Sequence, residues 1–336
     1  MTKSNTRSGA VQEQAPPGAC PDVSIIVVSW NTRELLVQCL RSCSERSVTG
    51  KLRTEVIVVD NASSDGSAEA ARTFAGVEVV ALSHNIGYGR ANNLGIARGS
   101  GRYFLILNPD TILLPRSVEG LVDYADRAPR AGIVAPRLLN EDLTVQASAF
   151  KFPTLAMAAI DLFPLPNWLP GRVRVRLLNS TLNGRYAVEQ QANEPFLIQH
   201  PLGACMLIRR EAHQECGGFD PNIFMYSEEI DLALRYARAG WQCWQVPRAR
   251  VVHLGGRSTS QAPIAMQREL WRSRLYIYRK HRSRLAYVAL KLLLLLAQGV
   301  AMLTVTVKVL LGVIPAREAA RRMRLARTLI KVAVSR

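Results

Sequence analysis

Hydrophobic runs and helical periodicities alternate along the first third of the chain. Residues 23–30 form a nearly continuous apolar, β-branched run, which predicts a strand buried on both faces of a parallel sheet. The same patterning predicts further strands at 55–59, 77–82 and 103–107, and helices at 34–44, 68–74 and 89–98. Because strand and helix alternate without an internal repeat, this order predicts a doubly wound, mostly parallel α/β sheet.

Polar residues gather where these predicted strands end. They are Ser29 and Asn31, Asp60 and Asp65, Asn85, and finally Asn108 and Asp110. An open α/β sheet binds its ligand at the carboxyl ends of its strands. Any one of these residues could simply cap a helix or make a turn. Four loops with carboxylates or amides on one rim favour a ligand site instead.

Several common nucleotide and hydrolase motifs are absent from the sequence. No GxGxxG follows the first strand, and neither GxxxxGK[ST] nor GxSxG occurs. A nucleotide bound at this rim therefore needs its diphosphate neutralised by another group, for which a carboxylate-bound divalent metal is the usual answer. The six cysteines have neither CxxC nor zinc spacing, which predicts reduced thiols in a cytoplasmic compartment.

Seven motifs together carry a family resemblance. In order they are IIVVSWN (25–31), VIVVDNASSDGS (56–67), HNIGYGRANNLGI (84–96), YFLILNPDT (103–111), GGFDPNIFMYSEEIDLALR (217–235), AGWQCWQVPRARVVHLGG (239–256) and RSRLYIYRKH (272–281). The chain from about 23 to 281 resembles glycosyltransferase family 2, in its bacterial rhamnosyltransferase-like branch. The resemblance implies a GT-A fold, with a Rossmann-like nucleotide half at about 23–112 and an acceptor half at about 113–281. It also implies a metal-dependent hexosyltransferase that inverts the anomeric centre.

The resemblance implies a set of residues that bind the nucleotide-diphosphate sugar. They are Ser29, Asn31, Asp60, Asp65, Asn85, Gly87, Arg90, Asn92, Asn108 and Gly203. Asp60 stands where the family binds the base and ribose, and Asp65 assists in the same loop. Arg90 stands on the diphosphate side, where a guanidinium can fork onto phosphate oxygens.

The segment Asn108-Pro109-Asp110 occupies the place of the family's DXD motif. Asp110 supplies the carboxylate that Mg²⁺ or Mn²⁺ prefers, whereas Asn108 leaves the site one anionic ligand short. The resemblance assigns His253 as the second metal ligand. A lone histidine after a strand more often makes a structural hydrogen bond, so this assignment depends on the family pattern.

Glu228, Glu229 and Asp231 form the densest carboxylate cluster of the sequence, at the start of a predicted helix. Acidic residues there could merely complement the helix dipole. Inverting sugar transfer, however, needs a carboxylate that accepts the proton of the acceptor hydroxyl. The resemblance implies that Glu229 is this base, with Glu228 as the fallback and Asp231 as a structural or acceptor-orienting residue.

The net charge of +17 is concentrated near the C-terminus. Residues 268–336 hold 16 Lys and Arg against two Asp and Glu, a net of +14. Within this region Lys291 and Lys308 enclose 16 uncharged residues, slightly fewer than the ~20 that span a bilayer. We therefore predict that 282–336 is an apolar, basic helical tail that associates with an anionic membrane surface at the cytoplasmic face, either spanning it or lying on it. A soluble helical subdomain is the alternative.

Three further expectations concern the rest of the chain. Residues 1–22 are polar and predict a disordered leader without a signal peptide. The segment 150–186, rich in proline and arginine, is either an ordinary loop insertion or an amphipathic flap near a lipid-linked acceptor. The Leu-rich run in the tail excludes a nucleic-acid-binding arm, which would be polar with interspersed aromatic residues.

The branch resemblance suggests L-rhamnose as the sugar, given by dTDP-rhamnose to a lipid-linked or cell-envelope glycan. Another UDP- or GDP-sugar in the same family is one alternative. A catalytically inactive nucleotide-sugar-binding scaffold is an alternative of another class, which the asparagine at position 108 permits.

Overall fold

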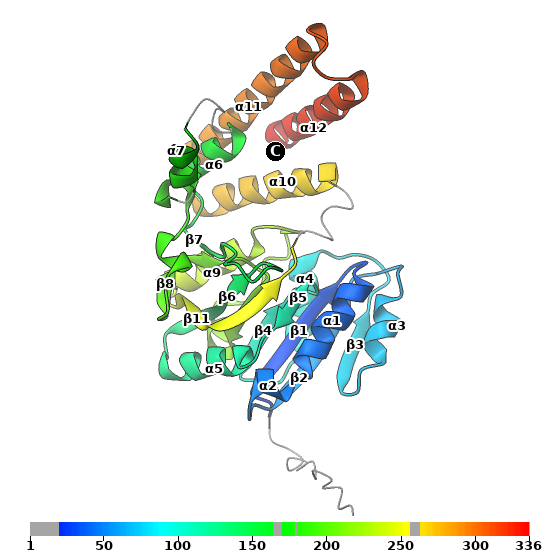
Figure 1. Cartoon of the computed structure of the whole chain (residues 1–336), viewed down its shortest axis with the longest axis vertical. Helices are drawn as coiled ribbons and strands as arrows, with labels where there is room; N and C mark the ends of the chain where they lie inside the picture. The colour runs from blue at the N-terminus through cyan, green and yellow to red at the C-terminus, as the bar shows by residue number, and fades with distance from the viewer. Residues whose placement is uncertain (1–19, 164–169, 179, 256–262, 336) are drawn as a thin grey trace, which may run out of the picture.

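The computed structural model describes residues 20–335 except 164–169, 179 and 256–262. Most of the predicted leader, residues 1–19, lies outside the described residues. An α/β body occupies one end of the structure and a group of long helices the other, as Figure 1 shows. The helix α10 (Pro263–His281) lies between these two parts.

The first four strands form a parallel sheet in the order β3–β2–β1–β4, and this confirms the predicted α/β class. They are β1 (Val23–Ser29), β2 (Thr54–Asp60), β3 (Val77–Ala81) and β4 (Tyr103–Leu107). Their register places Ser29 beside Asp60, so two of the predicted polar strand ends lie next to each other. All seven residues of β1 are buried, as expected for a strand covered on both faces.

The same sheet continues into the second half of the chain through one antiparallel strand. The strands are β10 (Cys205–Arg209), β6 (Ala131–Leu139), β11 (Gln242–His253), β5 (Thr111–Leu113) and β8 (Phe196–Ile198). Because β10 runs antiparallel to β4, the loop before β10 meets the loop after β4, and Asn108 N donates to Ala204 O at 2.8 Å. A separate two-stranded sheet pairs β7 (Ala149–Phe150) with β9 (His200–Pro201).

Alternate residues of the strands face two helical layers. On one face lie α1 (Arg33–Cys43), α2 (Arg46–Thr49), α3 (Ser67–Arg72) and α5 (Ser117–Arg127). On the other lie α4 (Tyr88–Arg98), α8 (Arg210–Cys216) and α9 (Glu228–Arg238). In β1, for example, Ile25 and Val27 pack in the first layer while Ile26 packs in the second. These hydrophobic contacts fix which strand ends face the ligand rim.

The long helices form a second hydrophobic core of their own. The antiparallel pair α11 (Arg284–Leu310) and α12 (Ala316–Val334) packs on α10 and on α6 (Leu155–Leu162). Three α10 residues, Trp271, Leu275 and Tyr278, are buried in this core. We call α10, α11 and α12 together the helical unit. It begins before residue 282, where the sequence alone places the start of the tail.

The segment 150–186 is partly helical. It contributes α6, the exposed α7 (Gly171–Leu178) and a short 3₁₀ turn (Thr181–Asn183), which a second 3₁₀ turn (Ala187–Gln190) follows. Because α6 contacts α11, this segment lies against the helical unit. Residues 164–169, which carry part of the predicted flap, lie outside the described residues.

One face of α11 is apolar and exposed. Large side chains recur along it at intervals of three or four residues, namely Leu285, Val288, Leu292, Leu296, Val300, Leu303 and Val307. Within the described part of the chain, α11 is the one helix long and apolar enough to cross a membrane by length and composition. Only 28% of its most apolar window is buried against the rest of the protein.

A buried ionic cluster, which we call the clasp, joins α10 to α9. Lys280 Nζ lies 2.5 Å from Asp220 Oδ2 and 2.7 Å from Asp231 Oδ1. Asp231 Oδ1 also lies 2.6 Å from His281 Nε2, and its Oδ2 accepts from Arg235 Nε at 2.8 Å. Burial alone would raise the pKa of Asp231, but the hydrogen bonds from Lys280, His281 and Arg235 outweigh burial and lower it. Asp231 thus has a packing role within the fold.

We expect Asp231→Ala to destabilise the protein by about 1–3 kcal/mol, because the change leaves the buried His281 and the partly exposed Lys280 and Arg235 without their shared partner. Urea unfolding followed by circular dichroism measures this loss. Asp123→Ala, at an exposed position of α5, is the matched control and should change the unfolding free energy by less than about 0.5 kcal/mol. Equal stability of the two variants would refute the clasp.

Candidate active site

A cavity of about 310 Å³, the rim cavity, opens where β1, β2 and β4 end. Seven residues predicted from the sequence line it: Asn85, Asn108, Asp110, Gly203, Glu228, Glu229 and His253. They come from loops, from the start of α9 and from the end of β11, and the continuous sheet brings them together. The cavity therefore collects amide, carboxylate and imidazole groups at one place.

Asp110 and His253 face each other in the rim cavity. His253 Nε2 lies 3.5 Å from Asp110 Oδ1, and both side chains are largely buried. Nδ1 of the same imidazole lies 2.7 Å from Gln146 Oε1, and Gln146 Nε2 donates to the His253 carbonyl at 3.2 Å. An amide oxygen that accepts from Nδ1 leaves the Nε2 lone pair directed at Asp110, the arrangement that metal-binding histidines commonly have.

This pair suits a divalent metal that is also bound by substrate. The described residues contain no group of three or more His, Cys, Asp or Glu side chains that could hold an ion. A carboxylate and an imidazole are nevertheless suitable ligands for Mg²⁺ or Mn²⁺, which fill remaining positions with water and phosphate oxygens. The donor set therefore fits an ion shared with a diphosphate better than a closed, all-protein metal site.

Asn108 has a different partner, which the sequence did not reveal. The Tyr88 hydroxyl donates to Asn108 Oδ1 at 2.7 Å and also lies 3.2 Å from the Gly203 carbonyl oxygen. Burial raises the pKa of Tyr88 well above its ordinary value, and the nearby Glu228 charge adds to the rise, so its phenol stays protonated. Tyr88 thus fixes the Asn108 amide and the loop before β10 together.

Glu228 and Glu229 begin α9 and project into the rim cavity. Burial and the charge of Glu229 raise the pKa of Glu228 well above its usual range. Burial raises the pKa of Glu229 to about 7. Both shifts favour the protonated form, and a pKa of about 7 lets Glu229 alternate between carboxylate and acid near neutral pH. The side chain of Glu229 lies against Gly203, where an added Cβ would meet its Cβ at 3.6 Å.

Asp60 and Ser29 lie beside the rim cavity without lining it. Asp60 is 2% exposed; its Oδ2 accepts from Ser63 N at 3.0 Å, while no donor among the described residues reaches Oδ1. A buried carboxylate oxygen without a donor suits a ligand N–H or hydroxyl. The hydroxyl of Ser29 is buried 3.0 Å from that of Thr32.

Asn31 and Asp65 line a different, neighbouring cavity with Arg33. Asp65 accepts from Arg33 N at 2.8 Å and from the Ser67 hydroxyl at 2.6 Å. Burial would raise the pKa of Asp65, but these hydrogen bonds outweigh it and lower the pKa. Asp65 therefore ties the loops after β1 and β2 together in this structure.

Three more predicted residues lie at the start of α4 and do not line the rim cavity. Gly87 has φ of +89°, and a Cβ there would lie 2.6 Å from the Phe224 carbonyl oxygen, so only glycine fits. Arg90 donates from Nε to the Pro221 carbonyl at 2.6 Å and does not line the cavity. Asn92 is buried, and its Nδ2 donates to Tyr88 O at 3.0 Å. Gly87 and Arg90 thus connect α4 to the segment 221–224, whereas the Asn92 hydrogen bond lies within α4.

The family model described as glycosyl transferase family 2 matches residues 24–217. This chain belongs to glycosyltransferase family 2. The glycosyltransferase is 31% identical over 260 residues to an N-acetylglucosaminyl-diphospho-decaprenol L-rhamnosyltransferase of Mycobacterium tuberculosis, covering 72% of this chain and 78% of that protein. It is 24% identical to the rhamnosyltransferase WbbL of Escherichia coli, covering 69% and 83% respectively.

Among solved structures, the glycosyltransferase is similar to the mannosyltransferase PcManGT of Pyrobaculum calidifontis in complex with GDP-Man and Mn²⁺. The TM-score is 0.55 at 17% identity, over 95% of this chain and 87% of that one. This likeness confirms the predicted GT-A fold. The curated relatives confirm the predicted rhamnosyltransferase-like branch. The roles of individual site residues stay predictions.

Proposed function

We propose that the glycosyltransferase moves L-rhamnose from dTDP-rhamnose, with inversion, to a hydroxyl of a lipid-linked or cell-envelope glycan. Both relatives support the sugar, since both carry rhamnosyltransferase names, and the name of the mycobacterial relative supports a lipid-linked acceptor. The observation that carries the reaction type is the rim cavity, which holds Asp110, His253 and Glu229 together. Another UDP- or GDP-sugar is the alternative donor.

In this proposal Asp110 and His253 would hold Mg²⁺ or Mn²⁺, and the ion would supply neutralisation of the negative charge on the leaving diphosphate. Gln146 fixes the imidazole, because its amide engages both Nδ1 and the backbone carbonyl of His253. The unpartnered Oδ1 of Asp60 accepts a hydrogen bond from the base or ribose. These residues bind and orient the donor, and none of them exchanges a proton with the acceptor.

Glu229 takes the proton of the acceptor hydroxyl as that oxygen attacks the anomeric carbon. A base works best when its pKa lies near the operating pH, and a pKa of about 7 meets this condition. Burial and the adjacent charge of Glu229 raise the pKa of Glu228, and this favours its protonated form and makes it the less suitable base. The presence of a tuned carboxylate beside the metal pair favours an active enzyme over an inactive scaffold.

We expect Glu229→Gln to retain dTDP-rhamnose binding but to lower the transfer rate by roughly 10²–10⁴, because an amide cannot accept the proton. In the unaltered enzyme the rate should rise with pH through about 7, as Glu229 ionises. Rhamnose transfer to a soluble glycan acceptor, followed by mass spectrometry, measures both effects.

Glu228→Gln is the matched control for this base, since it changes the adjacent carboxyl in the same way. It should retain most of the activity, because in this proposal Glu228 does not take the proton of the acceptor hydroxyl. The opposite pattern, loss with Glu228→Gln and none with Glu229→Gln, would move the base to Glu228. Transfer from UDP- or GDP-sugars but not from dTDP-rhamnose would overturn the donor.

We expect Asp110→Asn to weaken Mn²⁺ binding in the presence of dTDP by at least about tenfold, because the ion loses its anionic protein ligand. Electron paramagnetic resonance of free Mn²⁺ measures the affinity. Asp123→Asn removes the same charge on the exposed side of α5 and should leave the affinity unchanged. Equal Mn²⁺ binding by both variants would show that the pair is not a metal site.

We further propose that the helical unit holds the enzyme on the cytoplasmic face of a membrane. The apolar face of α11 is exposed over most of its length. The neighbouring α12 adds Arg317, Arg321 and Arg324, which are exposed and follow the i, i+4, i+7 spacing of one helix face. Apolar and cationic groups together suit the interface of an anionic bilayer.

We expect the triple change of Arg317, Arg321 and Arg324 to Gln to weaken binding to anionic phospholipid vesicles by roughly 100-fold, at about 1 kcal/mol for each cation. Vesicle sedimentation at physiological salt measures this. Changing Arg41, Arg72 and Arg127, which are exposed on the α/β body, removes the same charge and should have little effect. Equal losses in both triple variants would remove α12 as the contact.

A further inference from the structure

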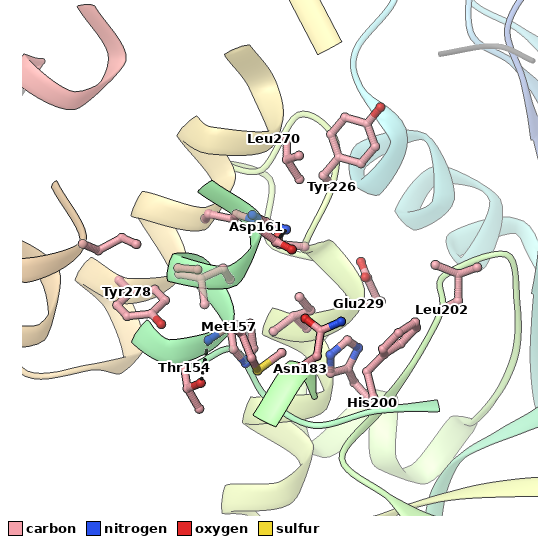
Figure 2. A pocket seen from close by; sticks show the side chains of 18 of the residues that line it. Thr154, Met157, Asp161, Asn183, His200, Leu202, Tyr226, Glu229, Leu270 and Tyr278 are labelled. Atoms are coloured by element: carbon pink, nitrogen blue, oxygen red, sulfur yellow. Dashed lines mark hydrogen bonds and ion pairs between the residues drawn. The ribbon is translucent and has the colours of Figure 1, made fainter. Parts of the chain in front are cut away.

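A second cavity, of about 280 Å³, lies between the α/β body and the helical unit, and we call it the interface cavity (Figure 2). It shares Leu202, Tyr226 and Glu229 with the rim cavity, so the two spaces meet at the predicted base. Its lining also includes Leu290 of α11, a buried member of the helical core. The interface cavity therefore connects the site of transfer to the helix with the exposed apolar face.

One side of α10 supplies a wall of this cavity. Leu270, Arg274, Ile277 and Tyr278 line it, at positions i, i+4, i+7 and i+8 of a single helix face. Figure 2 shows Tyr278 on one side of the cavity and Glu229 on the other, with Asp161 from α6 above them. This wall combines two apolar side chains with a cation and a phenol.

Tyr278 carries a buried polar group that nothing in the described protein satisfies. The residue is 3% exposed, and its hydroxyl has no hydrogen-bond partner among the described residues. Burial raises the pKa of Tyr278, so the group stays a donor at any physiological pH. A buried donor without an acceptor is costly, and in a cavity wall it indicates a ligand with acceptor oxygens.

Arg274 adds a positive charge to the same wall, one helical turn before Tyr278. Its Nη2 lies 2.8 Å from Asp161 Oδ2, and its guanidinium lies over the Trp271 ring at 4.9 Å. One carboxylate uses only part of the five-donor guanidinium. Arg185, also in the cavity lining, packs over the Phe150 ring at 5.1 Å. The lining therefore offers donors for more anionic oxygens than Asp161 provides.

We propose that Arg274 and Tyr278 bind the diphosphate of a lipid-linked acceptor inside the interface cavity. The inference rests on the proposed function, in which the acceptor hydroxyl lies at Glu229. In such an acceptor the diphosphate stands between sugar and lipid. The cavity is arranged compatibly: Figure 2 shows Glu229 on one side and Tyr278 on the other, and Leu290 of α11, which shares a hydrophobic cluster with Tyr278, also lines it.

Farnesyl diphosphate tests this assignment, because it carries the diphosphate and a lipid but no sugar. Binding to the full-length protein in detergent is measured by calorimetry with saturating dTDP, which fills the rim cavity. Farnesol and inorganic pyrophosphate serve as the two half-ligands. We expect farnesyl diphosphate to bind at least tenfold more tightly than either, and Arg274→Gln and Tyr278→Phe to remove most of that advantage.

Asp161→Asn separates anion binding from a merely structural ion pair. If Arg274 binds a diphosphate, removing its competing carboxylate should strengthen farnesyl diphosphate binding severalfold. If the pair only stabilises the fold, Asp161→Asn should weaken binding as Arg274→Gln does. Arg272→Gln is the matched control, since this α10 arginine is 62% exposed, pairs with Glu269 and lies outside the cavity lining.

The outcomes distinguish this inference from the proposed function. Unchanged farnesyl diphosphate affinity in Arg274→Gln and Tyr278→Phe would overturn the inference even if rhamnose transfer is intact. Farnesol binding as tight as farnesyl diphosphate would identify a neutral lipid pocket and overturn it equally. The expected binding pattern in an enzyme that transfers no rhamnose would support the diphosphate site and refute the proposed donor.

Discussion

Lys280 lies between the buried carboxylates of Asp220 and Asp231. The position of the helical unit relative to the α/β body depends on these two ion pairs. A cation between two desolvated anions tolerates little displacement, because losing either partner leaves an uncompensated buried charge. The clasp therefore fixes α10 to α9 within a narrow range of positions. Since α9 begins with Glu228 and Glu229, and α10 forms a wall of the interface cavity, one ionic cluster sets the distance between the predicted base and that wall.

The same low-dielectric surroundings have opposite effects on neighbouring acids. Asp231 has three cationic or donor partners, and the pKa of this carboxyl falls although it is buried. Glu228 and Glu229 lie three and two positions earlier. No cationic side chain among the described residues pairs with either of them, and burial raises their pKa values. A single helix thus carries one structural carboxylate whose ionised form is favoured and two carboxyls whose protonated forms are favoured. Separation of acids by environment in this way is typical of catalytic sites.

Local pattern predicted the strands and their polar ends well, because a buried parallel strand leaves a signal in consecutive residues. The bounds of β4 agree with the predicted 103–107, and those of β1 differ by one residue. The sequence did not indicate the roles of Tyr88 and Gln146, because each contacts a partner that is distant along the chain. Gln146 touches a histidine 107 positions away. The sequence did not indicate the interface cavity either. Its walls come from α6, α9 and α10, and only the packing of these helices places Tyr278 and Glu229 around one cavity.

The two faces of α10 connect α11 and α12 to the candidate active site. Tyr276 and Lys280 bind Asp220 in the α/β body, whereas Trp271, Leu275 and Tyr278 are buried against α11 and α12. Removing α11 and α12 would expose those three side chains, at a cost of roughly 1.5–3 kcal/mol for each. The helix that carries the cavity wall is therefore stabilised by α11 and α12. Because Leu290 of α11 also lines the interface cavity, an acceptor bound as we propose would contact α11 while its hydroxyl lies at Glu229.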